Sequence, residues 1–101
     1  MNRYQPYARK FSRNRTSVLI IGDESVNRLS GFKGRNGLPC FVVNRSKQGA
    51  RIEYVIKEQM AGLSDFEVII VGVGSHNLRD LENLSAKWTE LMKAVSNNFL
   101  Y

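Results

Sequence analysis

Two short apolar segments set the strongest limit on how this chain can fold. Residues 17–21 and 67–73 are nearly continuous runs of β-branched and aliphatic side chains, and each run leads into glycine. Runs of this kind are typical of strands that are buried on both faces of a parallel sheet. Small polar and ionisable residues follow each run, at the end of the strand where open parallel sheets bind ligands. The sequence therefore predicts an α/β fold with a candidate site at one edge of its sheet.

Helices and one further strand are predicted between and after these two segments. Residues 25–29 read as a short helix, a glycine-rich loop follows, and residues 40–43 read as a strand. Residues 51–60 have apolar side chains at helical spacing, and Gly62 is placed to cap the end of that helix. A longer helix is predicted over residues 81–97, with Asn77, Asp80 or Asn83 as its N-cap. Its apolar face consists of Leu81, Leu84, Trp88, Leu91, Met92 and Val95.

The alternation of strands and helices favours a flavodoxin-like, doubly wound parallel sheet with helices on both faces, a three-layer α/β architecture. Right-handed crossovers place the first strand in the centre, in the order 2-1-3. The ends of the first and third strands then meet at one rim of the sheet. The third strand would form an open edge, which favours association with a second copy. The chain ends where a further strand is expected, so we expect a truncated form of this fold.

Length and composition limit the location and the chemistry. A chain of 101 residues forms one domain at most. No apolar run is long enough to cross a membrane, and the N-terminus lacks the apolar segment of a signal peptide, so a cytoplasmic or nuclear location without membrane contact is expected. The single Cys40 has no partner for an internal disulfide and no metal-site spacing, and we interpret it as a packing residue.

Positive charge is concentrated in the first 16 residues. The formal net charge is +6, and this segment contributes five basic residues and no acid, while the rest of the chain is nearly neutral. Residues 1–15 read as a flexible basic arm and residues 16–101 as the folded domain. Basic residues interleaved with aromatic ones suit contacts to the phosphates and bases of RNA or DNA, and a solvated tail is the alternative. The basic residues of the arm are Arg3, Arg9, Lys10, Arg13 and Arg15.

Three short motifs at the predicted strand ends resemble the conserved blocks of the SGNH (GDSL-type) hydrolases. Residues 18–29, with Gly22-Asp23 at the strand end, resemble the first block, Gly-Asp-Ser. Gly49, ahead of the second helix, resembles the glycine of the second block, and residues 74–78 resemble the third block, Gly-x-Asn-Asp. The resemblance covers about residues 16–97 and is closest to the esterase-like domains of retroelement proteins. It implies hydrolysis of a small ester or acetyl group through a serine acyl-enzyme, without a cofactor.

The motifs depart from the family at decisive positions. Aligned without gaps, the nucleophilic serine of the family falls on Glu24, and its oxyanion asparagine falls on His76. Ser25 and Asn77 each come one place later. The fourth block, Asp-x-x-His, has no counterpart, and His76 is the only histidine of the chain. The resemblance therefore predicts the fold more firmly than the activity.

The residues at the two strand ends have defined candidate roles. Ser25 is the candidate nucleophile and His76 its candidate base, although serine is also a preferred helix N-cap. Gly49 and Asn77 are the candidate oxyanion donors. Asp23 and Glu24 are supporting residues, expected to accept backbone N–H groups at a helix start. A divalent ion held by Asp23, Glu24 and His76 is an alternative, but no metal or cofactor is expected.

The favoured functional interpretation is an SGNH-type ester hydrolase-like domain with weak or no activity. The first alternative is a nucleic-acid-binding accessory protein that uses the basic arm. The second is a structural module that self-associates through the open sheet edge. The sequence does not name a substrate.

Overall fold

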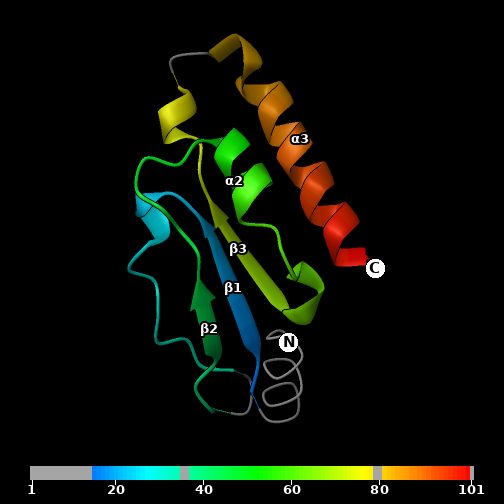
Figure 1. The fold of residues 1–101 in the computed structure, drawn as a ribbon. Helices are drawn as coiled ribbons and strands as arrows, with labels where there is room; N and C mark the ends of the chain where they lie inside the picture. Colours follow the sequence, from blue (N-terminus) through cyan, green and yellow to red (C-terminus); the bar gives the residue numbers. More distant parts are fainter. Residues whose placement is uncertain (1–14, 35–36, 79–80, 101) are drawn as a thin grey trace.

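The computed structural model describes residues 15–34, 37–78 and 81–100 and contains one parallel sheet, two α-helices and three short 3-10 helices (Figure 1). No helix among these residues is long and apolar enough to cross a membrane. In chain order the elements are β1 (Ser17–Gly22), η1 (Glu24–Val26), β2 (Phe41–Asn44), α2 (Ile52–Glu58), η2 (Leu63–Asp65), β3 (Val68–Gly72), η3 (Ser75–Asn77) and α3 (Leu81–Leu100).

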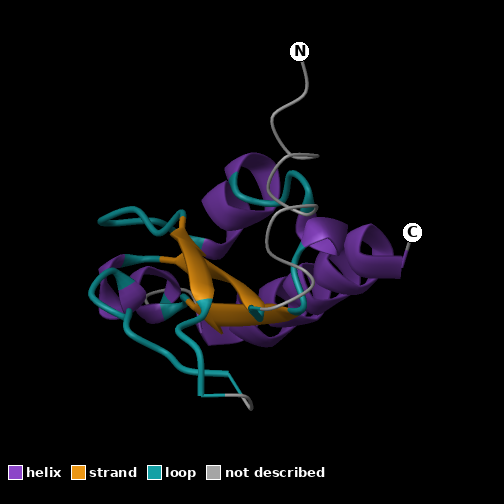
Figure 2. Cartoon of the chain, turned by 90° about the horizontal axis from the view of Figure 1, so that it is seen from below, coloured by secondary structure: helices purple, strands orange, loops and turns teal. Residues whose placement is uncertain are grey.

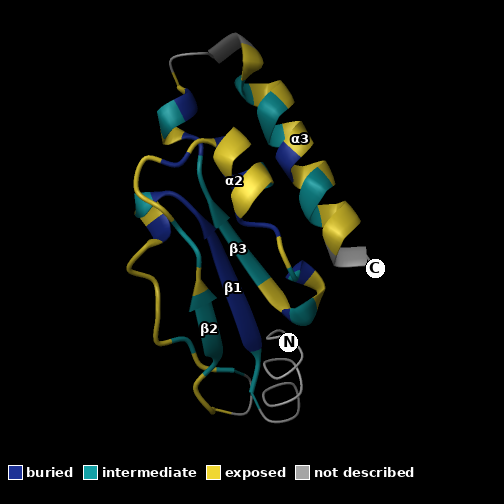
Figure 3. Ribbon diagram, in the orientation of Figure 1, coloured by how far each residue is buried: buried dark blue, intermediate teal, exposed yellow. Residues whose placement is uncertain are grey.

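The predicted sheet is confirmed: its three strands, their parallel pairing and their order are as expected. The order is β2-β1-β3, and β1 pairs in parallel with both neighbours. Val18 lies opposite Val42 on one side and Val68 on the other, and Gly22 lies opposite Gly72. The central β1 is buried along its whole length, whereas β3, at the edge, is half-buried (Figure 3). Association through the β3 edge stays a prediction.

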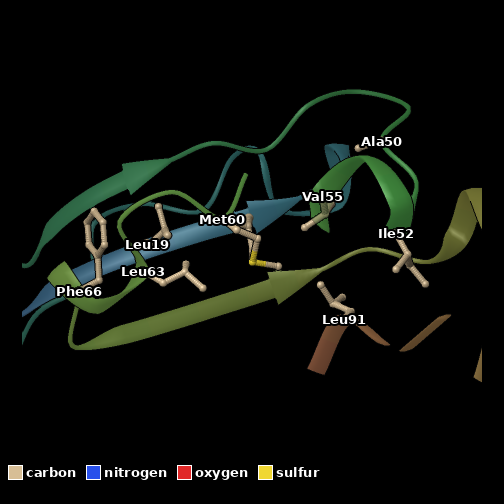
Figure 4. Packing of buried hydrophobic residues seen from close by; sticks show 9 residues of the cluster. Leu19, Ala50, Ile52, Val55, Met60, Leu63, Phe66 and Leu91 are labelled. Carbon is tan, nitrogen blue, oxygen red and sulfur yellow. The ribbon is translucent and has the colours of Figure 1, made fainter. Parts of the chain in front are cut away.

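Both α-helices pack on the same face of the sheet. Leu19 and Ile21 of β1 meet Ile52 and Val55 of α2 and Leu91 of α3 in one buried cluster (Figure 4). Met60, Leu63 and Phe66, from the segment between α2 and β3, complete that cluster. This arrangement agrees with a right-handed connection from β2 through α2 to β3. Helix α3 follows β3 and lies on the same face as α2.

The opposite face is covered by the β1–β2 connection, which includes the short η1, and not by an α-helix (Figure 2). Val18 and Ile20 pack there against Val26, with Phe32 and Cys40 partly buried beside them. The helix predicted over residues 25–29 is present on this face only as the three-residue η1. The Asn44 side chain donates to the carbonyls of Val26 and Asn27 at 3.0 and 3.4 Å.

Several helix boundaries and faces also differ from the sequence-based expectation. Helix α2 ends at Glu58, and Gln59 is its C-cap, so Gly62 does not cap it; Gly62 has φ +71° and begins η2 instead. Asn77 lies in η3 and Asn83 inside α3, so neither is the N-cap of α3, and Asp80 lies outside the described residues. Met92, predicted on the buried face of α3, is exposed.

The ends of β1 and β3 approach each other closely. The Asp23 N–H donates to Gly72 O at 2.9 Å, one residue beyond the last strand pair. Gly22 has φ +140°, and a Cβ built there would lie 2.0 Å from Gly72 O, so only glycine fits. This close approach brings the residues that follow β1 next to those that follow β3.

Candidate functional site

The candidate site consists of residues 23–25 after β1 and residues 75–77 after β3. The predicted meeting of these two segments is confirmed by side-chain contacts between them. Ser75 Oγ donates to Asp23 Oδ2 at 3.1 Å, and His76 Nε2 lies 2.8 Å from Glu24 Oε2. The geometry follows from the parallel pairing of β1 and β3, which places their carboxyl ends at one rim.

Asp23 organises the turn that follows β1. Its side chain is 1% exposed, and its Oδ1 accepts both the Ser25 N–H at 2.8 Å and the Ser25 hydroxyl at 2.6 Å. Asp23 is thus the N-cap of η1, and the N-cap role predicted for Ser25 is wrong. A carboxylate at this position satisfies backbone N–H groups that the short helix leaves unpaired.

Glu24 lies between Gly49 and His76. Its Oε1 accepts the Gly49 N–H at 2.8 Å, and its Oε2 pairs with His76 Nε2 at 2.8 Å. Because a carboxylate only accepts, Nε2 carries the hydrogen of this bond. The Gly49 N–H, followed by the backbone N–H of Glu24 itself and the His76 ring, lowers the pKa of Glu24 to about 2. Glu24 is therefore a carboxylate at neutral pH.

Ser25 and His76 do not form the predicted nucleophile and base pair. Ser25 Oγ donates to Asp23 Oδ1 and lies 3.5 Å from Gly72 O, while His76 Nε2 is bonded to Glu24. Among the contacts of the described residues there is no hydrogen bond between Ser25 and His76. Ser25 thus contacts Asp23, while Glu24 contacts the residues that follow β3.

Asn77 supports the fold and is not placed as an oxyanion donor. It is fully buried, its Oδ1 accepts the Ile52 N–H at 3.0 Å, and its Nδ2 donates to Glu53 Oε1 at 3.1 Å. Glu53 also pairs with Lys87 of α3 at 2.6 Å. The Lys87 ammonium, and then the Asn77 amide, lower the pKa of Glu53 to about 2. Asn77 therefore joins the β3 end to α2 and, through Glu53, to α3.

Three polar residues of the site were missed by sequence reasoning. Gln59 is buried and exchanges two hydrogen bonds with the Gly22 backbone, at 2.7 and 3.2 Å. A sequence signal for it exists, since Gln59 falls at the helical spacing of the buried Ile52 and Val55. Ser75 and Glu53 have no comparable signal, because polar residues at exposed positions are common.

An open groove of about 300 Å³ adjoins Gly49, on the α2 side of the site. Lys47, Arg51 and Tyr54 contribute to its lining. Arg51 also donates to the backbone carbonyl of His76, which fixes η3 against α2. The groove is open to solvent and lies beside Gly49, whose N–H donates to Glu24.

The predicted nucleic-acid-binding arm falls mostly outside the described residues. Arg3, Arg9, Lys10 and Arg13 belong to that part of the chain. Arg15 is described, and its guanidinium donates to Pro39 O at 2.9 Å and to Cys40 O at 3.4 Å. Arg15 therefore holds the start of β1 against the β1–β2 connection, a role that sequence reasoning did not assign.

Asp23, Glu24 and His76 could together hold a cation. One ligand atom from each of the three side chains lies within 4.8 Å of the other two. The donors are two carboxylate oxygens and an imidazole nitrogen, a set that suits several divalent metals. In the part of the chain that the structure describes, no other group of three such side chains is close enough.

Comparisons of the chain with protein-family models, with curated proteins and with solved structures found no match. The resemblance to SGNH hydrolases thus stays a prediction from three motifs.

Proposed function

We propose that this chain is an SGNH hydrolase-like domain in which serine acyl transfer does not operate. The observation that supports this most directly is the position of Glu24. Its carboxylate is bonded to the Gly49 N–H, which the resemblance assigns as an oxyanion donor. It is also bonded to His76, the residue on which the oxyanion asparagine of the family falls. The groups that an ester substrate would need are engaged by the protein itself.

The charges and hydrogen positions at the site disfavour acyl transfer. Acyl transfer needs a serine within reach of a base, and donors aimed at the oxygen that becomes negative. Here the Ser25 hydroxyl donates to Asp23, and the His76 nitrogen nearest the site carries the hydrogen that it donates to Glu24. The Glu24 carboxylate would also repel a developing oxyanion near Gly49, since like charges at this range disfavour each other.

The test is labelling of the folded protein with a serine-directed fluorophosphonate, read by intact mass. We expect no adduct on the wild-type chain under conditions that fully label an active serine hydrolase added to the same tube. Ser25→Ala and His76→Ala are treated in parallel, and circular dichroism checks that each protein is folded. A single adduct on the wild type that disappears in both variants would contradict the proposal.

We also propose nucleic-acid binding by the basic arm as a second candidate function. Its support is the charge distribution, since Arg3, Arg9, Lys10 and Arg13 lie in one short segment that also contains Tyr4, Tyr7 and Phe11. Phosphate contacts together with base stacking suit single-stranded RNA or DNA. Arg15 is left out of this candidate because its guanidinium holds the β1–β2 connection.

A further inference from the structure

Two carboxylates and an imidazole converge where β1 and β3 end. Asp23 and Glu24 follow β1 directly, and His76 follows β3 on the neighbouring strand. Their ligand atoms lie within 4.8 Å of one another, and the Glu24 Oε2 to His76 Nε2 distance is 2.8 Å. The three residues come from separate parts of the chain, so the tertiary structure and not a local motif assembles them.

We infer that Asp23, Glu24 and His76 form a binding site for a divalent transition-metal cation such as Zn²⁺ or Mn²⁺. Metal–ligand bonds of about 2.1 Å around a tetrahedral ion place the ligand atoms roughly 3.4 Å apart. Glu24 Oε2 and His76 Nε2 are closer than this, at 2.8 Å, and a ligand atom of Asp23 lies within 4.8 Å of the other two side chains, so all three can converge on one ion after the side chains adjust. Mixed oxygen and nitrogen donors select this class of cation over Ca²⁺ or Mg²⁺, which prefer oxygen ligands alone.

The two carboxylates are held in place by their other hydrogen bonds. Asp23, buried in the turn, is oriented by Ser25 on Oδ1 and by Ser75 on Oδ2. The Gly49 N–H fixes Oε1 of Glu24 and leaves Oε2 toward His76. Such outer partners orient metal ligands and lower the cost of assembling them.

Charge and access also suit a divalent cation. Two carboxylates and a neutral imidazole present two negative charges, which one divalent ion balances. On binding, the ion takes the place of the Nε2 hydrogen of His76, and the neutral ring then carries its hydrogen on Nδ1. The side chains of Glu24 and His76 are 41% and 36% exposed, so water can reach the ion and complete its coordination.

Arg51 is a charged side chain in contact with the His76 backbone. Its guanidinium donates to the backbone carbonyl of His76 and lies 3.9 Å from Glu53, so its charge is partly balanced outside the cluster. Glu53 itself pairs with Lys87 and is not one of the three converging side chains. Glu90, an exposed carboxylate of α3, is also not one of the three converging side chains and provides the control carboxylate.

The test uses the full chain without a histidine tag, freed of metal with a chelator. Zn²⁺ is titrated by calorimetry, and Mn²⁺ is titrated while the ring protons of His76 are followed by NMR. His76 is the only histidine, so its ring signals are unique. We expect one ion per chain and selective broadening of these signals by Mn²⁺. Glu24→Gln and His76→Gln should each weaken binding by at least ~10-fold, since even outer partners of a metal cost that much.

Glu90→Gln should bind Zn²⁺ like the wild type. Absence of saturable Zn²⁺ binding at millimolar metal would overturn the inference. A Zn²⁺ affinity equal to that of the wild type in either Glu24→Gln or His76→Gln would also overturn it. Asp23→Asn is left out of the decisive set because Asp23 also holds the turn. The measurement uses no substrate and does not rest on the proposed function. A fluorophosphonate adduct on Ser25 would refute that function and leave this inference intact.

Discussion

Asn77 joins three elements through a single buried amide. Its Oδ1 accepts from the first residue of α2, and its Nδ2 donates to Glu53, which reaches α3 through Lys87. A buried amide with both ends satisfied stabilises a fold chiefly because removal of either bond leaves a buried polar group unpaired. The residue that the resemblance assigned to chemistry thus acts in this chain through packing and hydrogen bonding.

Replacing Asn77 by alanine should destabilise the protein. The change leaves the Ile52 N–H without its acceptor, and we expect a decrease of ~1–3 kcal/mol in the free energy of unfolding, measured by urea denaturation. Asn98→Ala is the matched control, because Asn98 is exposed and its side-chain amide donates within α3, to Ala94 O. Equal decreases in the two variants would contradict the role given to Asn77.

Glu53 should make the stability of the protein depend on pH in the acid range. Its pKa in the folded protein is about 2 against an ordinary value of 4.5, so the folded state favours the carboxylate. The stabilisation is fully present above about pH 4.5 and disappears as the pH falls toward 2. Glu53→Gln should therefore differ most from the wild type at neutral pH, with a gap in urea midpoint that narrows below about pH 4.5. A gap that stays constant down to about pH 2.5 would argue against the Lys87 and Asn77 contacts.

At the scale of elements, the contact between the ends of β1 and β3 creates the site. Gly22 and Gly72 are paired, and the backbone there leaves no room for a side chain on Gly22. Gln59 also holds this backbone in place, because its side-chain amide is hydrogen-bonded to both the N–H and the C=O of Gly22. Residues 23–25 therefore leave the sheet in one fixed direction.

Gly22→Ala should cost at least ~2 kcal/mol of stability, because the new Cβ meets Gly72 O and the backbone is also strained. Gly31→Ala is the control, since Gly31 also has a positive φ, +75°, but no atom lies within 4 Å of its built Cβ. Only the strain of about 1 kcal/mol applies there. The urea denaturation midpoints of the two variants are compared with that of the wild type. An equal decrease in both variants would show that the close approach of Gly22 to Gly72 O is unimportant.

At the scale of the whole molecule, the excess positive charge lies in a segment of the sequence that is distinct from the site residues. The first 16 residues hold five basic residues and no acid, while the remaining chain is nearly neutral. A charge distribution of this kind favours binding to a polyanion through the arm, with the folded domain as its support. The candidate site and the candidate nucleic-acid contact can then be tested separately.

Replacing Arg3, Arg9, Lys10 and Arg13 together by glutamine should weaken binding of single-stranded RNA, measured by fluorescence anisotropy at several salt concentrations. The slope of log affinity against log salt should shrink by roughly 0.7 for each phosphate that the arm no longer neutralises. Arg15 is retained because it holds Pro39 O. The control replaces four exposed lysines of the domain by glutamine, with the same change of charge: Lys33, Lys47, Lys57 and Lys93. Equal weakening in both variants would show that net charge, and not the arm, binds RNA.

The sequence by itself determined the three strands, the two main helices and the strand order. These depend on apolar periodicity and on the handedness of connections, which are properties of local segments and of all parallel sheets. It also placed the site at the rim shared by β1 and β3. Periodicity did not reveal that the helix between β1 and β2 is only three residues long. It also could not reveal that the Asn44 side chain, from a later strand, binds the Val26 and Asn27 carbonyls.

Only the tertiary structure decided what the site residues contact. The turn after β1 forms the 3-10 helix η1, in which successive side chains point about 120° apart. Ser25 therefore contacts Asp23, while Glu24 contacts Gly49 and His76. Spacing along the chain cannot fix such directions, since they depend on the Gly22 and Gly72 contact and on partners in distant parts of the chain. Asn77, a candidate oxyanion donor from the sequence, is likewise buried by contacts between distant parts of the chain and supports α2.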